Sequence, residues 1–319
     1  MSRHLRLLAA LVAAFALATA GLVTTSAQAV TTVSVSGRVV DANGVGVRGL
    51  SISAERGDED DEDYADLGLT RTGGTFSSTG YGGLAPGTWT LVVSDDDANP
   101  EYATTFKSVT LVAGANALGD IVVPLSSNAE GSVTAPSGRK LTNVQVLALP
   151  GDGTFPDEPD SSFFYSLGFA ETDTAGDFRM PGLSVGPYTA FAVFEEDEEL
   201  PTHHVAFDVA TPGQTVTGVN LTGIKVPPSV RIKGTSPAKG KATLTLTVSA
   251  ARYGIANPGG RFDLYLGSKK IRSAVGFTNG SRTVHLIGLA KGKRTFKFKY
   301  LGSTDTRPKW SNKITVTVR

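Results

Sequence analysis

After a short N-terminal segment, the chain alternates hydrophobic and polar side chains in brief runs. Alternation with a period of two is typical of β-strands that bury one face, and Gly, Pro, Asn and Asp between the runs favour turns. No later stretch has the 3.6-residue period of an amphipathic helix. The predicted strands include 34–40, 50–54, 88–93, 119–123, 143–148, 188–193, 242–248, 261–266, 295–300 and 314–318. We expect an all-β protein built from antiparallel β-sandwiches.

The N-terminal segment has the pattern of a signal peptide. Arg3 and Arg6 precede the apolar stretch 7–22, and Ala27-Gln28-Ala29 supplies the small residues that a signal peptidase needs. No later apolar run reaches the ~20 residues of a membrane helix. We therefore expect residues 1–29 to be removed and the mature protein to be secreted and extracellular, without a membrane span and with cell-wall association as an option.

One segment of the chain occurs twice. Gly83–Trp89 recurs as Gly182–Tyr188, with Gly, Leu, Gly and an aromatic residue at the same places and an offset of 99 residues. A repeat of this size indicates two copies of one small domain. After the linker Pro227-Pro228 the strand pattern changes. The predicted organisation is a signal peptide over 1–29, then three antiparallel β-sandwiches over 30–125, 129–223 and 226–319.

Short motifs accompany both copies of the repeat. In the first copy they are Gly37-Arg38-Val39, Gly44, Gly74-Thr75-Phe76 and Gly83–Trp89, and in the second they are Gly131-Ser132-Val133, Gly176-Asp177-Phe178 and Gly182–Tyr188. With these motifs, the first two domains resemble the carboxypeptidase regulatory-like family, a prealbumin-type sandwich of the starch-binding-domain-like group. The resemblance implies a fold, because the glycines serve tight turns and the aromatic residue packs in the core.

The third domain carries other motifs. Gly267–Lys270, Gly288–Gly292 and Phe296–Gly302 give it a resemblance to the bacterial Ig-like repeats of actinobacterial secreted proteins. The two resemblances together cover nearly the whole mature chain and leave no segment for a catalytic domain.

The formal net charge of zero conceals two opposite charges. Residues 30–124 hold 5 Lys and Arg against 14 Asp and Glu, residues 125–223 hold 3 against 14, and residues 224–319 hold 20 against 2, which gives −9, −11 and +18. Charge segregation bears on partners and solubility. The acidic domains can serve solubility alone. The basic domain can dock on a wall polymer of the teichoic type, on anionic lipid or on extracellular nucleic acid, or fold back on the acidic pair.

The expected partner is a cell-wall polyanion or a carbohydrate. The candidate polyanion-binding residues lie in stretches that look like Gly-flanked loops: Lys269, Lys270, Lys291, Lys293 and Arg294. Aromatic and basic residues also alternate over 296–299, a pattern that puts the aromatics in the core and the lysines on the solvent face of a strand. We therefore predict no specific nucleic-acid partner. The oligomeric state is not predicted.

Acidic loops are the weak candidates for a metal. Ca²⁺ takes six to eight oxygen ligands, which a carboxylate cluster can supply. The candidates are Asp58, Asp60, Asp61 and Asp63. However, no Asp-x-Asp-x-Asp-Gly loop is present, and strand counting places this loop and the acidic loop 95–101 at opposite ends of the domain. No other cofactor is expected, and a chain without Cys excludes thiol chemistry.

No catalytic constellation is recognisable. The chain has 4 His, too few for a triad of the usual kind. We expect a secreted, non-enzymatic, surface-associated binding or spacer protein whose basic C-terminal domain associates with a polyanion or the cell wall. The alternative is an extracellular starch- or glucan-binding accessory protein of polysaccharide degradation. Its module family could lead to an amylase-type annotation, although no catalytic domain is present. Candidate aromatic platforms for that alternative are Tyr64, Tyr81, Tyr102, Phe163, Phe164 and Tyr165.

Overall fold

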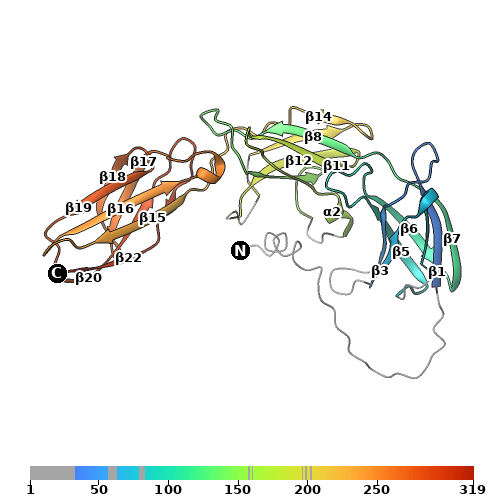
Figure 1. Cartoon of the computed structure of the whole chain (residues 1–319), viewed down its shortest axis with the longest axis horizontal. Helices are drawn as coiled ribbons and strands as arrows, with labels where there is room; N and C mark the ends of the chain where they lie inside the picture. Colours follow the sequence, from blue (N-terminus) through green and yellow to red (C-terminus); the bar gives the residue numbers. More distant parts are fainter. Residues whose placement is uncertain are drawn as a thin grey trace, which may run out of the picture.

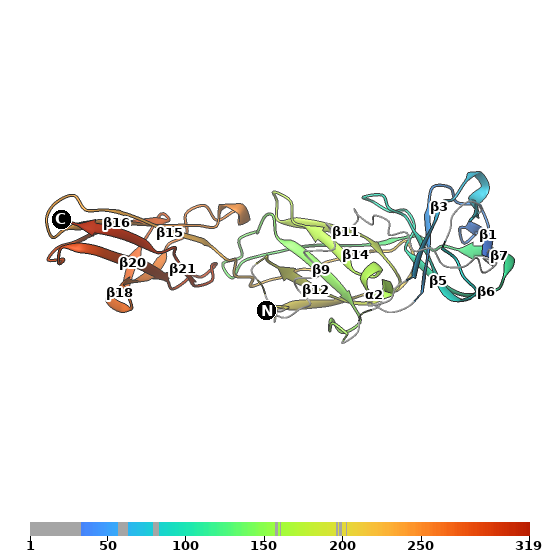
Figure 2. The ribbon, with the colours of Figure 1, turned by 90° about the horizontal axis from the view of Figure 1, so that it is seen from below.

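The computed structural model describes residues 33–56, 63–78, 83–156, 159, 161–195, 197, 200–201 and 203–319. They form three β-sandwiches in a row: β1–β7 build the first, β8–β14 the second and β15–β22 the third (Figures 1 and 2). The predicted all-β fold is confirmed. The predicted signal peptide, 1–29, lies outside the described residues. Within the described part, no helix has the length and apolar character needed to cross a membrane.

The first sandwich packs a three-stranded sheet, β4–β1–β7, against a four-stranded sheet, β3–β2–β5–β6. Its strands are β1 (Val33–Val40), β2 (Ser51–Arg56), β3 (Asp63–Leu69), β4 (Thr75–Ser77), β5 (Gly87–Ser94), β6 (Thr105–Leu111) and β7 (Gly114–Val122). Trp89, Ile52 and Leu91 are buried between the sheets. The first and last strands pair in parallel, whereas the other pairs of this sandwich are antiparallel.

The second sandwich repeats this topology strand for strand. Sheets β11–β8–β14 and β10–β9–β12–β13 take the places of the two sheets of the first sandwich, and β8 and β14 again pair in parallel. The elements are β8 (Ser127–Ser132), β9 (Gln145–Pro150), α2 (Ser161–Tyr165), β10 (Gly168–Glu171), β11 (Asp177–Leu183), β12 (Gly186–Val193), β13 (His204–Val209) and β14 (Thr215–Thr217). The internal repeat is therefore a repeat of fold.

One feature of the repeat explains a recurring glycine. Gly37 lies opposite Phe76 across the β1–β4 pair, and Gly131 lies opposite Phe178 across the β8–β11 pair. A Cβ atom on Gly131 would lie 1.9 Å from the carbonyl oxygen of Val219 and 3.1 Å from the Phe178 ring. The absence of a side chain lets the aromatic ring and the segment after β14 approach the backbone.

The third sandwich has a different topology. A sheet β15–β16–β19 packs against a sheet β18–β17–β20, and β21 and β22 both pair with β20. The strands are β15 (Ser229–Thr235), β16 (Ala242–Ser249), β17 (Gly260–Leu266), β18 (Lys269–Phe277), β19 (Ser281–Leu286), β20 (Gly292–Tyr300), β21 (Lys309–Trp310) and β22 (Ile314–Val318). Its core contains the fully buried Phe262, Phe296 and Phe298.

The sequence pattern does not predict the helix α2. It lies on the side of the second sandwich that faces the first (Figures 1 and 2). The Tyr165 ring contacts Phe106 of β6 at 6.1 Å between centroids, and its hydroxyl donates a hydrogen bond to Glu55 Oε1 of β2 at 3.3 Å. A helix of five residues is too short to produce a hydrophobic period.

The junction between the second and third sandwiches is packed. Val226 lies just before Pro227-Pro228, yet it is fully buried in the core of the second sandwich together with Tyr253 and Ile255 of the third. The Val226 N–H donates to the Asp305 carbonyl at 3.0 Å, and the Arg307 N–H donates to the Val226 carbonyl at 2.9 Å. The segment that resembles a linker in the sequence is thus held by the two domains it connects.

Ionic contacts surround this junction. The Arg307 guanidinium pairs with the Asp197 carboxylate and lies 4.8 Å above the centre of the Phe194 ring. Arg252 pairs with Glu195 at 3.0 Å. Two carboxylates of the acidic run 195–199 therefore bind the basic domain. This is a local form of the expected attraction between acidic and basic domains, because the domains meet end to end in a row (Figure 1).

Candidate functional site

The outer face of the β17–β20 sheet combines basic and aromatic side chains. Phe296 and Phe298 are fully buried, so strand alternation turns Lys297 and Lys299 of β20 outward. The interpretation of the 296–299 pattern as a sheet pattern is confirmed. On the same face, Tyr265 of β17 lies opposite Lys297, and Trp310 of β21 lies opposite Lys299.

Lysines line the length of β20. Lys293, Lys297 and Lys299 share the outward phase, and Thr295 occupies the place between the first two. At ~3.4 Å per residue, the row extends over about 20 Å. Its first residue, Lys293, lies opposite Thr317, close to the C-terminus, at the end of the third sandwich remote from the second (Figure 1). The row therefore runs from the free tip of the molecule along the whole of β20.

Two aromatic rings lie within this row. The Tyr265 and Trp310 ring centroids are 5.0 Å apart, with an interplanar angle of 57°. Lys297 Nζ lies 4.1 Å from the centre of the Trp310 ring, and Lys299 Nζ lies 5.6 Å from it. An ammonium over an aromatic face is attracted by the ring quadrupole. We call Tyr265, Lys293, Lys297, Lys299 and Trp310 the lysine–aromatic face.

The only carboxylate on the strands of this sheet is neutralised. Asp263 of β17 is 5% exposed, and its carboxylate forms an ion pair with Lys270 at 2.5 Å and accepts the Ala274 N–H at 2.8 Å. The hydrogen bond from Lys270 holds the pKa of Asp263 below its usual range, and the same contact raises the pKa of Lys270. The pair contributes no net charge to the face.

The five predicted polyanion-binding residues fall into different environments. Lys269 and Lys270 begin strand β18, and Lys293 and Arg294 belong to strand β20, so only Lys291 lies in a loop. The expectation of loops for the other four is wrong, because the glycines beside them turn the chain directly into strands. Lys269, Lys291 and Lys293 are exposed.

Two of the five are engaged within the domain. Lys270 is paired with Asp263. Arg294 donates from Nε to the Ala290 carbonyl at 3.0 Å and from a terminal nitrogen to the Lys291 carbonyl at 3.4 Å. The Arg294 side chain therefore stabilises the turn that precedes β20. Lys269, Lys291 and Lys293 remain as the accessible cations of the predicted set.

The remaining carboxylate of the third sandwich faces away from this region. Asp305 accepts the Ser137 N–H at 3.0 Å and the Ser137 hydroxyl at 2.8 Å, and both groups belong to the second sandwich. Among the described residues, no carboxylate forms an ion pair with Lys291, Lys293, Lys297 or Lys299. The positive charge of the lysine–aromatic face is thus not compensated from within the described chain.

The weak Ca²⁺ candidates are not brought together. Asp58, Asp60 and Asp61 lie outside the described residues, and Asp63 pairs with Arg56 across the β2–β3 hairpin. Because β2 and β5 are antiparallel, Asp63 and Asp95 lie at opposite ends of the sheet, as strand counting predicts. Asp95 accepts the Glu101 N–H at 2.7 Å and so shapes its own loop. The described residues contain no group of three or more acidic or His side chains suited to a metal.

The aromatic residues proposed as carbohydrate platforms serve mainly as cover. Phe163 packs edge-on against Phe155 at 5.0 Å, over the outer side of the β9–β12 pair. Tyr165 contacts the first sandwich, and Tyr102 packs against its core. Tyr64 is half exposed, and Tyr81 lies outside the described residues. These residues do not form a shared platform.

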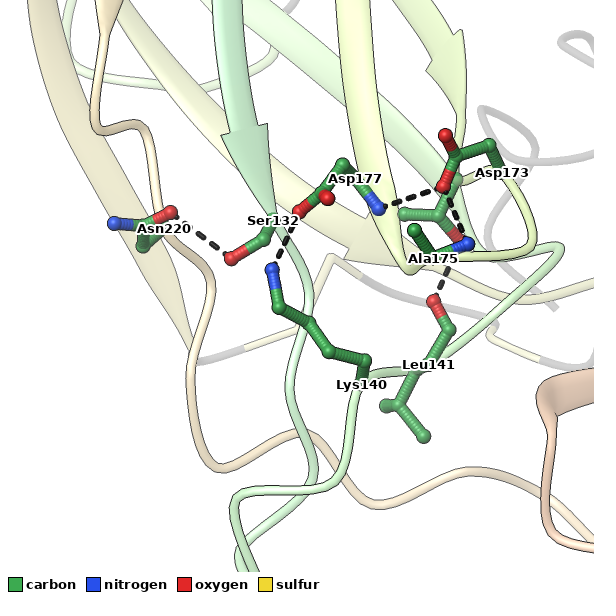
Figure 3. A network of polar contacts seen from close by, with 8 residues as sticks. Ser132, Lys140, Leu141, Asp173, Ala175, Asp177 and Asn220 are labelled. Atoms are coloured by element: carbon green, nitrogen blue, oxygen red, sulfur yellow. Dashed lines mark hydrogen bonds and ion pairs between the residues drawn. The ribbon is translucent and has the colours of Figure 1, made fainter.

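A polar hollow of about 820 Å³ lies on the second sandwich and includes the network of Figure 3. Lys140 pairs with Asp177, and the Ser132 hydroxyl donates to Asn220 Oδ1 at 3.0 Å. Asp173 accepts the N–H groups of Ala175 and Asp177 at 2.8 and 3.0 Å (Figure 3). These contacts tie β8, β11 and the segment after β14 together. Among the residues lining this hollow there is no His or Cys to activate a nucleophile.

Sequence reasoning missed Tyr265 and Trp310. One signal was available for Tyr265, because it is an aromatic residue at an outward position of β17, in which Phe262 and Leu264 point inward. Trp310 has no such signal. Its two-residue strand joins the face only through pairing with β20.

The comparisons with known proteins identify no family for this chain. No family model matches this sequence, and no curated protein matches it. The structure is similar to the Bacillus anthracis TIE protein over 90% of this chain and 48% of that chain, with 14% identity and a TM-score of 0.24. It is also similar to the minor pilin GBS52 of Streptococcus agalactiae, over 61% of this chain and 98% of that chain, with 13% identity and a TM-score of 0.28.

A third similar structure is that of BcpA, the major pilin subunit of Bacillus cereus, over 60% of this chain and 69% of that chain, with 13% identity and a TM-score of 0.30. The chain spans about half the length of the Bacillus anthracis protein. Because the TM-scores and identities are this low, these likenesses support no inference about activity or ligand.

Proposed function

We propose that this protein is a secreted, non-enzymatic surface module in which two acidic β-sandwiches space a basic β-sandwich that docks on an anionic polymer of the cell wall. The observation that carries the proposal is the uncompensated charge of the third sandwich. It holds 20 Lys and Arg against 2 Asp and Glu, and both carboxylates are engaged, Asp263 by Lys270 and Asp305 by Ser137.

The arrangement of the domains supports a spacing role. Of the acidic run, the described residues Glu195 and Asp197 contact the third sandwich at the junction. The basic tip around Lys291 lies at the far end of the row, beside the C-terminus (Figure 2). Like charges on the acidic pair repel a polyanion, so the polymer would meet the third sandwich first.

We also propose a domain type for each of the three sandwiches. We assign the first two sandwiches to the carboxypeptidase regulatory-like type, on the recurring Gly37–Phe76 and Gly131–Phe178 pairs, and the third to the bacterial Ig-like type. The signal-peptide pattern of residues 1–29 supports secretion. Domain boundaries at 30–125, 129–223 and 226–319 follow from the sequence repeats.

The test compares two charge reversals of equal size in the intact secreted chain. In one variant, Lys291→Glu and Lys293→Glu change the basic tip. In the control, Arg231→Glu and Lys233→Glu change two exposed residues of β15, on the opposite sheet of the sandwich. Both variants alter the net charge by the same amount, and exposed substitutions usually change stability by about 0.5 kcal/mol or less. The measurement is the affinity for purified anionic wall polymer and for neutral starch.

We expect the tip variant to bind the wall polymer more weakly than the control variant, with starch bound by neither. Equal weakening in both variants would mean that net charge alone matters and that no docking face exists. If both variants bind starch tightly and with the affinity of the wild type, the glucan-binding alternative is favoured over docking on a polyanion.

A further inference from the structure

The lysine–aromatic face contains a feature that charge attraction alone does not require. Trp310 is 42% exposed and lies beside Tyr265 within the lysine row. Lysines by themselves would attract any polyanion. An exposed indole at this place adds an apolar, electron-rich surface between the cationic groups. Such a surface discriminates between polyanions that contain rings and those that do not.

We propose that the lysine–aromatic face binds an acidic polysaccharide, with one sugar ring against the Trp310–Tyr265 pair and the carboxylates of that sugar and its neighbours on Lys297, Lys299 and Lys293. This inference rests on the proposed function and names the class of polyanion. The face of an aromatic ring carries partial negative charge and attracts the weakly positive C–H groups of a pyranose. The ammonium groups donate charge-assisted hydrogen bonds to carboxylates.

The positions of the lysines fit this chemistry. Lys297 and Lys299 both lie within 6 Å of the Trp310 ring centre, so a ring held against the indole has its acidic substituent near an ammonium group. Lys293 lies on the same strand, four residues before Lys297 and in the same phase, where it can meet a further unit of the polymer. The neutral Thr295 lies between them, with its hydroxyl hydrogen-bonded to that of Thr315 at 3.0 Å.

Single-stranded nucleic acid also combines rings with negative charge. It binds along rows of open aromatic faces, on which successive bases stack. Here the two rings are inclined at 57° with their centres 5.0 Å apart, so they do not offer a row of parallel faces to successive bases. One exposed indole flanked by cations suits one sugar of an acidic chain better than a series of bases.

The chain carries its own reporter for this site. It has two Trp residues, and Trp89 is 1% exposed in the core of the first sandwich. A change in Trp fluorescence on adding a polymer therefore reports on Trp310. The probes for the intact secreted chain are polygalacturonate, polyphosphate, neutral dextran and an oligothymidylate.

Affinities are measured for the wild type and for Trp310→Ala and Trp310→Phe. We expect polygalacturonate, but not polyphosphate, to shift the fluorescence of the wild type. Trp310→Ala should lower the affinity for polygalacturonate about tenfold, the loss of roughly 1.4 kcal/mol of stacking, and leave the affinity for polyphosphate within about twofold. Trp310→Phe keeps a ring and should restore most of the lost affinity. An unchanged thermal midpoint shows that the variants fold.

Three results would overturn this inference while leaving docking on polyanions intact. The first is an equal loss of affinity for both anionic polymers in Trp310→Ala, which would make Trp310 a support for the lysines. The second is no loss for either polymer. The third is tighter binding of the oligothymidylate with the same dependence on Trp310. In contrast, a wild type that binds no polyanion would contradict the proposed function itself.

Discussion

At the residue scale, the contact between the first and second sandwiches contains an unusual carboxylate. Glu55 is 6% exposed, and its Oε2 atom is buried without a hydrogen-bond partner. Its other oxygen accepts the Tyr165 hydroxyl at 3.3 Å. Burial, followed by the negative charge of Glu55, raises the pKa of Tyr165. Loss of the Tyr165 proton would remove this hydrogen bond and place two negative charges side by side.

This arrangement predicts loss of stability at alkaline pH. The folded protein holds the Tyr165 proton more tightly than the unfolded chain, whose tyrosine has the ordinary pKa of 10.0. The contribution of Tyr165 to stability is therefore complete below pH 10.0 and is lost as the pH rises through its raised pKa. Thermal unfolding of the wild type and of Tyr165→Phe, measured from neutral to alkaline pH, tests this expectation.

In Tyr165→Phe, the fall of the first unfolding transition above pH 10.0 should be smaller than in the wild type. Tyr64, Tyr102 and Tyr188, whose pKa values are also raised by burial, contribute to the remaining dependence. Identical pH profiles of the two proteins would show that the Tyr165–Glu55 contact does not link the first two sandwiches.

At the element scale, the repeat depends on close contact between strands. Gly131 of β8 has no room for a side chain, because a Cβ atom would meet the Val219 carbonyl oxygen at 1.9 Å. In contrast, Gly276 of β18 has open space around the same position. The two glycines both lie within strands, but only the first one joins neighbouring strands tightly.

Gly131→Ala should therefore destabilise the second sandwich by about 3 kcal/mol or more, since the backbone must move to relieve the clash. Gly276→Ala should change stability by about 0.5 kcal/mol or less. Denaturant unfolding, followed by circular dichroism, measures both. Similar stabilities of the two variants would contradict the account of the repeat.

The sequence predicts those strands in which alternation coincides with burial. In β16 and β22, apolar residues point inward at every second position. It predicts only the second half of β7, where Ile121 is the only buried residue of the strand, and it misses β3, whose acidic and small residues hide the period. An edge strand buries little, so its composition carries little information about its position.

The positive charge of the candidate site was predictable from the sequence, but its two aromatic residues were not. Lys291 and Lys293 stand out in the sequence because the third domain is so basic. The aromatic pair does not, because Tyr265 and Trp310 are brought together by the register of β20 with β17 on one side and β21 on the other. Register depends on tertiary packing, which local patterning does not specify for a two-residue strand.

At the scale of the whole molecule, the row of sandwiches depends on its junctions. Arg307 connects the second and third sandwiches through its ion pair with Asp197, its contact with the Phe194 ring and a hydrogen bond from Nε to the Lys225 carbonyl at 2.8 Å. If this junction is rigid, a polymer bound to the third sandwich is held away from the acidic pair.

Arg307→Ala should leave each sandwich folded but loosen the row. Removing one partner leaves the partly buried Asp197 carboxylate unpaired, which costs about 1–3 kcal/mol at the junction. Small-angle X-ray scattering should show a broader distribution of distances than in the wild type, whereas the exposed Lys313→Ala control should not. An unchanged distribution would mean that the apolar contacts around Tyr253 hold the domains without Arg307.

The central claim is that the third sandwich docks on an anionic polymer by electrostatic attraction. The most direct measurement is retention of the intact secreted chain on purified cell-wall polymer over a salt series. Interactions between exposed charges are screened within ~8 Å at physiological ionic strength and within ~3 Å at 1 M salt. We predict that the protein is bound at low salt and mostly released at high salt. Retention that does not change across the series would contradict the claim.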